Sequence, residues 1–173
     1  MTVFVSRLDI LDHLFDGRWT HIGDPSYDAY LFGQMQKAVS VLTSSGGKVV
    51  FLTTPYFATG EQPNGEPFPE DNPTRVDLYN SMLRTVASTH PGQVFVFDLN
   101  ALMDKGRKPL TTIDGVTVRF IDLVHFTPAG DCWLAPRILP FVERIVSPAG
   151  PVNHTPAAIP ATVCTDVAET WPF

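Results

Sequence analysis

The prediction of the fold depends most on one apolar stretch, Lys48-Val49-Val50-Phe51-Leu52-Thr53-Thr54. It runs apolar without alternating with polar residues, which is the pattern of a strand buried on both faces of a parallel sheet. Two further runs, Thr2-Val-Phe-Val-Ser6 and Gln93-Val-Phe-Val-Phe-Asp98, have a similar length and the same β-branched and aromatic character. We therefore predict three strands of one sheet.

Segments of helical periodicity separate these three runs. Asp24 can cap the first helix, Pro25 suits its first position, and Gly46-Gly47 ends it. A second helix is expected to begin near Pro73 and to stop at His90-Pro91-Gly92. The apolar side chains of the first helix are Tyr27, Leu31, Phe32, Met35, Ala38, Val39 and Leu42. Strands that alternate with helices imply parallel pairing through helical crossovers, hence an α/β three-layer sheet.

The remaining segments give weaker or more local signals. The polar stretch 9–23 is expected to hold one short amphipathic turn, and 55–73 reads as a long loop. Asp114-Gly115, between two short β-prone segments, predicts a hairpin turn. A last helix should run from Thr127-Pro128 toward Val146, with a break or kink where Pro136 and Pro140 fall inside it. We expect one domain over 1–147 and an extended Pro/Ala/Thr-rich tail over 148–173.

Composition limits the function classes. The chain has 173 residues, 44% of them hydrophobic, which predicts one compact domain with a core. Its formal charge of −6 argues against nucleic acid and anionic membrane surfaces as partners, since both favour clustered Lys and Arg. No run approaches the roughly 18 apolar residues of a membrane span, and the N-terminus lacks the pattern of a signal peptide.

The two cysteines, Cys132 and Cys164, are too few for a zinc site or a disulfide framework. Two interpretations stay open. They are either two unrelated reduced thiols or a single bridge that pins the C-terminal tail, and the bridge requires an oxidising compartment.

The segment Arg119-Phe-Ile-Asp122-Leu-Val-His125-Phe-Thr-Pro-Ala-Gly130 carries the clearest chemical signal. It places an Asp three residues before a His, between a strand-like segment and a Thr-capped helix. A carboxylate can fix the tautomer of an imidazole and stabilise its cation, while the imidazole takes a proton from a hydroxyl and returns it. Asp122 and His125 are therefore the candidate catalytic residues.

Asp-x-x-His followed by Phe-Thr-x-x-Gly resembles the last conserved block of the SGNH (GDSL-type) hydrolase family. The stretch from Thr2 to about Val146 is similar to the SGNH domains attached to membrane acyltransferases that O-acylate sugars. Three further segments carry this likeness: Leu11-Asp-His-Leu-Phe-Asp-Gly-Arg-Trp19, Asp114-Gly-Val-Thr-Val-Arg119 and Leu134-Ala-Pro-Arg-Ile-Leu-Pro140.

The resemblance implies a flavodoxin-like parallel sheet with helices on both sides. It implies ester hydrolysis or acyl transfer through a Ser–His–Asp triad, without metal or cofactor, on O-acyl esters of small molecules or of cell-envelope glycans. Asp122 would orient His125, and His125 would act as general acid and base. It also suggests an extracytoplasmic location if the chain is part of a longer protein.

The sequence departs from the family at the nucleophile. The family places a Gly-Asp-Ser block after its first strand, so the resemblance implies that the first one or two strands and the nucleophile precede Thr2. The third block reads Ser6-Arg7-Leu8-Asp9 here, without the family's Gly-x-Asn. Within the chain the candidate nucleophiles are Ser6, at the carboxyl end of a predicted strand, and Ser26, although a helix cap already accounts for the residues before Ser26.

Two other groups of residues have competing interpretations. Tyr56 and Phe57 follow a predicted strand on the side where ligands bind in such sheets, so they contact a substrate or, as we favour, anchor the loop. Asp9, Asp12, His13 and Asp16 form an acidic cluster with one His. It fits a solvated helix face better than a metal site, and we predict no metal.

Two functions are compatible with the sequence. The first is an SGNH-like esterase or acyltransferase domain whose serine comes from outside this segment. The second is a catalytically silent SGNH-like module. If the neighbouring strand is absent, Thr2–Ser6 would leave an apolar strand as an exposed edge, and the module would self-associate through it as a homo-oligomer.

Overall fold

The computed structural model describes residues 1–3 and 7–147. The chain folds into two compact units, a first unit, Met1–Pro109, and a second unit, Leu110–Phe173. Helices and strands alternate along the chain, so the α/β class predicted from the sequence is confirmed. None of the helices in the described ranges has the length and apolarity to cross a membrane. The expected tail, 148–173, lies outside the described residues, and its separation from a 1–147 domain stays a prediction.

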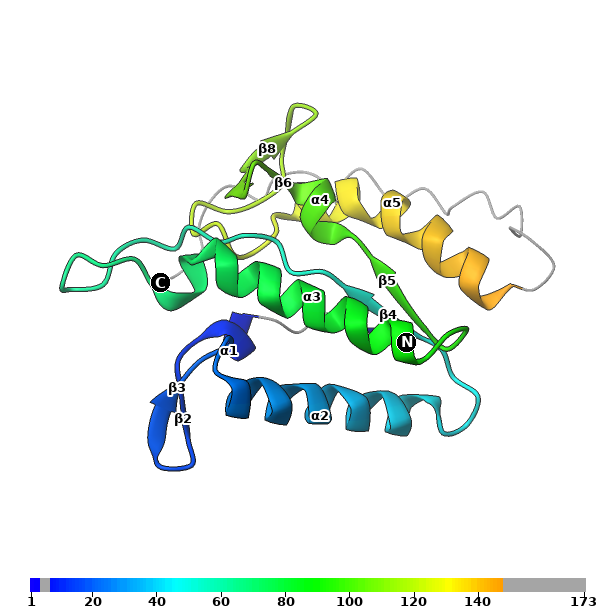
Figure 1. The fold of residues 1–173 in the computed structure, drawn as a ribbon. Coiled ribbons are helices and arrows are strands. Elements are labelled where there is room, and N and C mark those ends of the chain that lie inside the picture. Colours follow the sequence, from blue (N-terminus) through cyan, green and yellow to red (C-terminus); the bar gives the residue numbers. More distant parts are fainter. Residues whose placement is uncertain (4–6, 148–173) are drawn as a thin grey trace. The chain divides into compact units, whose positions relative to one another are not determined.

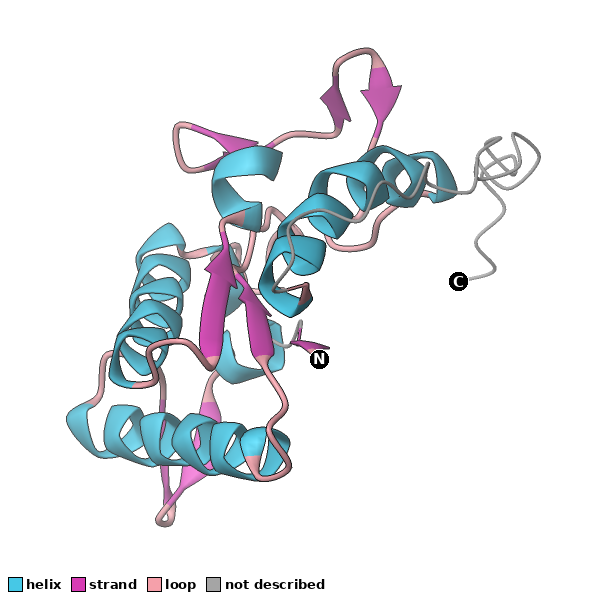
Figure 2. Cartoon of the chain, turned by 90° about the vertical axis from the view of Figure 1, so that its right-hand side faces the viewer, coloured by secondary structure: helices cyan, strands magenta, loops and turns pink. Residues whose placement is uncertain are grey.

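A three-stranded parallel sheet is the centre of the first unit (Figures 1 and 2). Its order is β1 (Thr2–Val3), β4 (Val49–Leu52) and β5 (Val94–Phe97). In the register of the sheet, Val50 lies opposite Thr2 on one side and Phe95 on the other. The three predicted strands are thus confirmed as parallel neighbours in chain order, although residues 4–6 of the predicted first strand lie outside the described residues. All four residues of β4 are buried, as its continuous apolar sequence requires.

Two long helices connect these strands: α2 (Pro25–Thr43) and α3 (Pro73–Thr89). They contact each other, α2 also contacts β4, and α3 contacts β5 (Figure 1). Each helix turns one apolar stripe inward, and for α2 this stripe was predicted from the helical spacing of its apolar residues. The buried residues of the two stripes are Tyr27, Leu31, Met35, Val39, Val76, Tyr79, Leu83 and Val86.

Short elements complete the first unit. The stretch 9–23 does not hold a single amphipathic turn. Instead α1 (Arg7–Ile10) leads into a hairpin of β2 (His13–Phe15) and β3 (Arg18–Thr20). The 3-10 helix η1 (Pro69–Asp71) lies in the long loop after β4. After β5 come α4 (Leu99–Met103) and the two-residue strands β6 (Asp104–Lys105) and β7 (Lys108–Pro109).

The second unit contains one hairpin and one long helix. Strands β8 (Thr112–Ile113) and β9 (Val116–Thr117) flank Asp114-Gly115, as predicted. Both turn residues have positive φ angles, 52° and 79°, which is the geometry of a two-residue type I′ turn. Helix α5 (Pro128–Val146) is continuous through Pro136 and Pro140, so the expected break is not present. A proline removes a backbone donor, but its fixed φ is close to the helical value, so the helix can continue past it. A kink at either proline stays a prediction.

Candidate active site

The loop between β9 and α5 forms a closed turn around Asp122 and His125. Arg119 bridges to Phe126 in an antiparallel pair, and the N–H of Phe120 donates to the carbonyl of His125 at 3.0 Å. Inside this frame the N–H of Leu123 donates to the carbonyl of Phe120 at 3.0 Å. The segment therefore has the ends of a hairpin and a compact polar turn at its tip.

Asp122 organises the tip of the turn and bonds to His125. Its Oδ1 accepts hydrogen bonds from the N–H groups of Val124 (2.9 Å) and His125 (3.0 Å). Its Oδ2 lies 2.6 Å from Nδ1 of His125. An ionised carboxylate only accepts, so Nδ1 carries the proton, and in the neutral imidazole Nε2 keeps the lone pair. The predicted pair is therefore brought together with Nδ1 on the carboxylate, as a base-orienting acid requires.

Asp122 is ionised, and the Asp–His pair is exposed on the second unit. Burial alone would raise the pKa of Asp122. The hydrogen bonds from the imidazole and from the two backbone N–H groups outweigh burial, so its pKa is lowered and the carboxylate stays ionised. The side chains of Asp122 and His125 are 44% and 57% exposed, which leaves the pair open to a reacting molecule.

Buried Arg119 supports the turn from beneath, a role that the sequence did not predict. Its side chain is 2% exposed, and Nη1 donates to the carbonyl of Leu123 at 3.3 Å. Leu123 has a φ of 55°, which an L-residue with a side chain rarely adopts. The guanidinium therefore holds the carbonyl of the strained residue between Asp122 and His125. The only signal in the sequence was a cation placed between apolar Val118 and Phe120.

Thr127 and Gly130 fix the start of α5 against β9. The Thr127 hydroxyl accepts from the N–H of Gly130 at 2.8 Å and donates to the carbonyl of Thr117 at 2.5 Å, so it caps the helix and ties it to the hairpin. A Cβ on Gly130 would lie 2.2 Å from the carbonyl oxygen of Val118. The Phe-Thr-x-x-Gly part of the motif therefore has a structural explanation: only glycine allows this approach.

A polar cluster joins the hairpin turn to the middle of α5. Asp114 Oδ2 accepts from Nε1 of Trp133 at 3.2 Å and from Nη2 of Arg137 at 3.1 Å. The Arg137 guanidinium also stacks on the Trp133 ring at 3.7 Å. Cys132, next to Trp133, is disulfide-bonded, and Cys164, the chain's other cysteine, lies outside the described residues. The disulfide bond of Cys132 argues against the interpretation of two reduced thiols, and whether it pins the C-terminal tail stays a prediction.

The contacts of Ser26 do not support it as the nucleophile. Ser26 is exposed in the first turn of α2, and its hydroxyl accepts from Nη2 of Arg18 at 2.8 Å, a cation and not a base. Asp24 stands at the cap position, but its side chain bonds to the Thr20 hydroxyl and to the N–H of His21 at 3.3 Å. Ser6 lies outside the described residues.

Tyr56 and Phe57 are buried, with exposed fractions of 8% and 7%. The N–H of Tyr56 donates to Asp104 at 2.6 Å, and its hydroxyl donates to Asp77 at 2.6 Å. These contacts favour the loop-anchoring interpretation, and a contact of either residue with substrate stays a prediction.

The acidic cluster of the first unit is divided among separate partners. Asp12 pairs with Arg75 at 2.6 Å, Asp9 accepts from the hydroxyl of Tyr79, and Nε2 of His13 bonds to a backbone carbonyl. Across residues 1–3 and 7–147, no three His, Cys, Asp or Glu side chains are grouped in a way that would hold a metal ion.

No protein-family model matches this chain, and no curated protein is significantly similar to it.

Proposed function

We propose that the chain is the C-terminal part of an SGNH-like serine esterase or acyl-transfer domain. In this proposal His125 is the general acid and base, Asp122 orients it, and a serine encoded upstream of Thr2 is the nucleophile. The observation that carries the proposal is the 2.6 Å contact between Asp122 Oδ2 and His125 Nδ1, made by an exposed pair. The imidazole then takes the serine proton at Nε2 and delivers it to the leaving group.

The sheet topology supports the finer fold proposal. In the flavodoxin-like strand order 2-1-3-4-5, the last three strands are neighbours in chain order. The order β1-β4-β5, all parallel, has this property. We therefore assign these strands to the third, fourth and fifth positions of a three-layer flavodoxin-like sheet, whose first two strands would lie on the side of β1 opposite β4.

Location and substrate follow from the same proposal. The disulfide at Cys132 favours an oxidising compartment, which supports an extracytoplasmic site of action. The substrates would be O-acyl esters of small molecules or of cell-envelope glycans, since the pair is open to solvent and a large polar acceptor can approach it. The chemistry itself requires only the serine, His125 and Asp122.

The experiment compares the 173-residue chain with the polypeptide extended by the residues encoded immediately upstream of Met1. The extended form should hydrolyse p-nitrophenyl acetate, and the shorter one should remain at the rate of buffer. In the extended form His125→Ala should lower kcat/KM by about 100-fold or more, the usual contribution of a positioned acid–base group. Labelling with a fluorophosphonate, followed by peptide mass spectrometry, then identifies the reactive serine.

His90→Ala is the matched control, because His90 lies at the end of α3 and its ring bonds to the backbone of its own helix. This variant should keep wild-type kinetics. Full activity in His125→Ala would overturn the proposal. Labelling of Ser26 in place of an upstream serine would also contradict it, since the hydroxyl of Ser26 is paired with Arg18.

A second candidate function is a catalytically silent module that self-associates through the Thr2–Ser6 segment. The observation in its favour is that, within the described residues, β1 has a strand partner on one side only. A parallel strand with an open side can pair with another chain. Light scattering distinguishes the two candidates: a monomer at micromolar concentration rules out the silent, self-associating module.

A further inference from the structure

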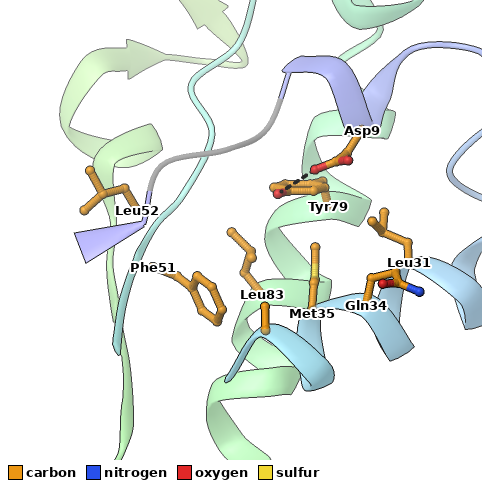
Figure 3. A pocket seen from close by; sticks show the side chains of 9 residues that line it. Asp9, Leu31, Gln34, Met35, Phe51, Leu52, Tyr79 and Leu83 are labelled. Carbon is orange, nitrogen blue, oxygen red and sulfur yellow. Dashed lines mark hydrogen bonds between the residues drawn. The ribbon is translucent and has the colours of Figure 1, made fainter. Parts of the chain in front are cut away.

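A cavity of about 210 Å³ lies in the first unit, between the sheet and its two long helices. It is well separated in sequence from the Asp122–His125 pair and is built from α1, α2, β4 and α3 (Figure 3). Its walls are formed by Asp9, Leu31, Gln34, Met35, Ala38, Phe51, Leu52, Tyr79 and Leu83. All of these residues belong to one compact unit, so the cavity is defined within it.

The shape and lining of the cavity suit a small apolar body. Seven of its nine side chains are hydrocarbon, aromatic or thioether groups, and they come from three elements, α2, β4 and α3 (Figure 3). An apolar cavity of roughly 150 Å³ accommodates a benzene molecule. A ligand body of about six to ten non-hydrogen atoms therefore fits. Gln34 and Ala38 are exposed on α2, so the cavity opens to solvent beside them.

The carboxylate of Asp9 lies at one end of the cavity, and an ionised carboxylate only accepts hydrogen bonds. The Tyr79 hydroxyl donates to Oδ2 of Asp9 at 3.2 Å (Figure 3), and the Tyr27 hydroxyl donates to its backbone carbonyl at 3.3 Å. Oδ1 receives no hydrogen bond from the described residues. Burial raises the pKa of Asp9, against the hydrogen bond from Tyr79 and the charge of His13. Burial also raises the pKa of Tyr79 far above its ordinary value, so this hydroxyl stays a donor.

These features determine which charge the polar head group of a bound ligand should carry. A carboxylate or phosphate would meet the negative charge of Asp9 and find the Tyr79 proton already used. A neutral hydroxyl would satisfy one lone pair but leave the poorly solvated charge without a counter-ion. An ammonium group supplies both donors and a positive charge, and hydrogen bonds between charged groups are about twice as strong as neutral ones.

We propose that this cavity binds a small organic amine, with its ammonium group on Asp9 and an apolar body between α2, α3 and β4. The site is independent of the esterase proposal, because it uses no residue of the Asp122–His125 loop. Its ligand class is a primary amine on a hydrocarbon or aromatic body the size of a benzyl group.

Three probes of similar shape test which head group the cavity binds: benzylamine, benzyl alcohol and benzoate. Each is titrated into the 173-residue chain near neutral pH, and binding is followed by the NMR chemical-shift changes of the methyl groups that line the cavity. Benzylamine should bind with a dissociation constant on the order of 1 mM, as expected for an eight-atom ligand. Benzyl alcohol should bind about tenfold more weakly, and benzoate should not bind.

Variants at Asp9 and Ala38 separate the effect of the Asp9 charge on binding from the effect of the shape of the cavity. Asp9→Asn should weaken benzylamine binding about tenfold or more, the loss expected for a charged hydrogen bond, and should leave benzyl alcohol within about threefold. Asp16→Asn makes the same charge change in the exposed β2–β3 turn and should leave all three affinities unchanged. Ala38→Phe, at the mouth of the cavity, should abolish binding of both benzylamine and benzyl alcohol.

Three results overturn the proposal. The first is no benzylamine binding to the wild-type chain up to 20 mM, about 20 times the expected dissociation constant. The second is equal binding of the three probes, which would mean that the cavity selects only for shape. The third is undiminished benzylamine binding in Asp9→Asn that still binds benzyl alcohol, since binding of the alcohol shows that the variant is folded.

Discussion

Replacing Gly130 by alanine tests the contact that fixes α5 on the β9 strand. An added Cβ would lie 2.2 Å from the carbonyl oxygen, 2.8 Å from the carbonyl carbon and 2.9 Å from the Cα of Val118. Ordinary contact begins near 3.4 Å, so the helix or the strand would have to move by about 1.2 Å. All three atoms belong to the backbone, which cannot swing aside as a flexible side chain would.

The expected destabilisation follows from two opposing effects. Overpacking a rigid site costs about 3 kcal/mol. Alanine gains at most about 1 kcal/mol over glycine from helix propensity, and less in the first turn, where Gly130 lies. We expect Gly130→Ala to lower the free energy of unfolding by about 2 kcal/mol or more. Because the Thr127 hydroxyl caps this same turn and ties it to the hairpin, the loss should also weaken the Asp122–His125 loop.

The matched control is Gly33→Ala, the same change in the interior of α2. A Cβ there would meet nothing within 4 Å, so only the propensity gain of about 1 kcal/mol should remain, and the variant should be more stable than wild type. Urea denaturation followed by circular dichroism at 222 nm measures both. If Gly130→Ala is stabilised as much as Gly33→Ala, α5 does not approach Val118 as described, and the structural explanation of Gly130 in the motif is wrong.

Two further predictions concern a buried amide and a carboxylate. Asn80→Ala should lower the free energy of unfolding by about 1–3 kcal/mol, measured by urea denaturation, because it leaves the buried N–H of Thr54 without its 2.7 Å partner. Ser81→Ala, on the exposed side of α3, is the control and should be neutral, and an equally neutral Asn80→Ala would contradict the reasoning. Asp122 has a lowered pKa in the folded chain, so its stabilising contribution should be complete above the unfolded pKa of about 3.9 and lost as the pH falls through the lower folded value. The urea midpoint of wild type should therefore exceed that of Asp122→Ala more at pH 7 than at pH 2, and an equal difference at both would refute it.

The elements that could be predicted from the sequence are those specified by local rules. The continuous apolar run of β4, the helical spacing of α2 and the Asp114-Gly115 turn each determine a structure without knowledge of distant residues. The β2–β3 hairpin was missed although Asp16-Gly17 is the same turn signal, with φ angles of 52° and 75°. Leu8, Leu11, Leu14 and Phe15 are spaced as in one amphipathic helical turn, and this spacing obscured the hairpin signal. In the structure Phe15 packs on Tyr27 and Tyr30, a contact between elements that no local rule contains.

The candidate site was predictable to the same extent. Asp122 and His125 are three residues apart, so a local turn brings them together and their spacing is sufficient to predict the contact. The position of the Arg119 side chain depends on how the turn folds over it, and nothing in the spacing of the residues indicates this. For Asp24 the position was predicted correctly, but the contact of its side chain was not. Its cap position was predicted from the following proline, but its carboxylate bonds to Thr20, because the preceding hairpin brings that hydroxyl close.

The parts of the Asp-x-x-His-Phe-Thr-x-x-Gly motif have different physical explanations, and structural contacts account for three of its residues. Gly130 is explained by the approach of Val118, and Thr127 by capping and by its bond to Thr117. Asp122 is explained in part by its two backbone hydrogen bonds, which do not involve the imidazole. A chain that kept the motif for structure alone would need these three residues. An aliphatic side chain at position 125 would preserve the backbone bonds of Asp122 and would remove only the bond between its Oδ2 and the imidazole. His125 is therefore the residue whose identity argues for catalysis, and its replacement is the decisive test.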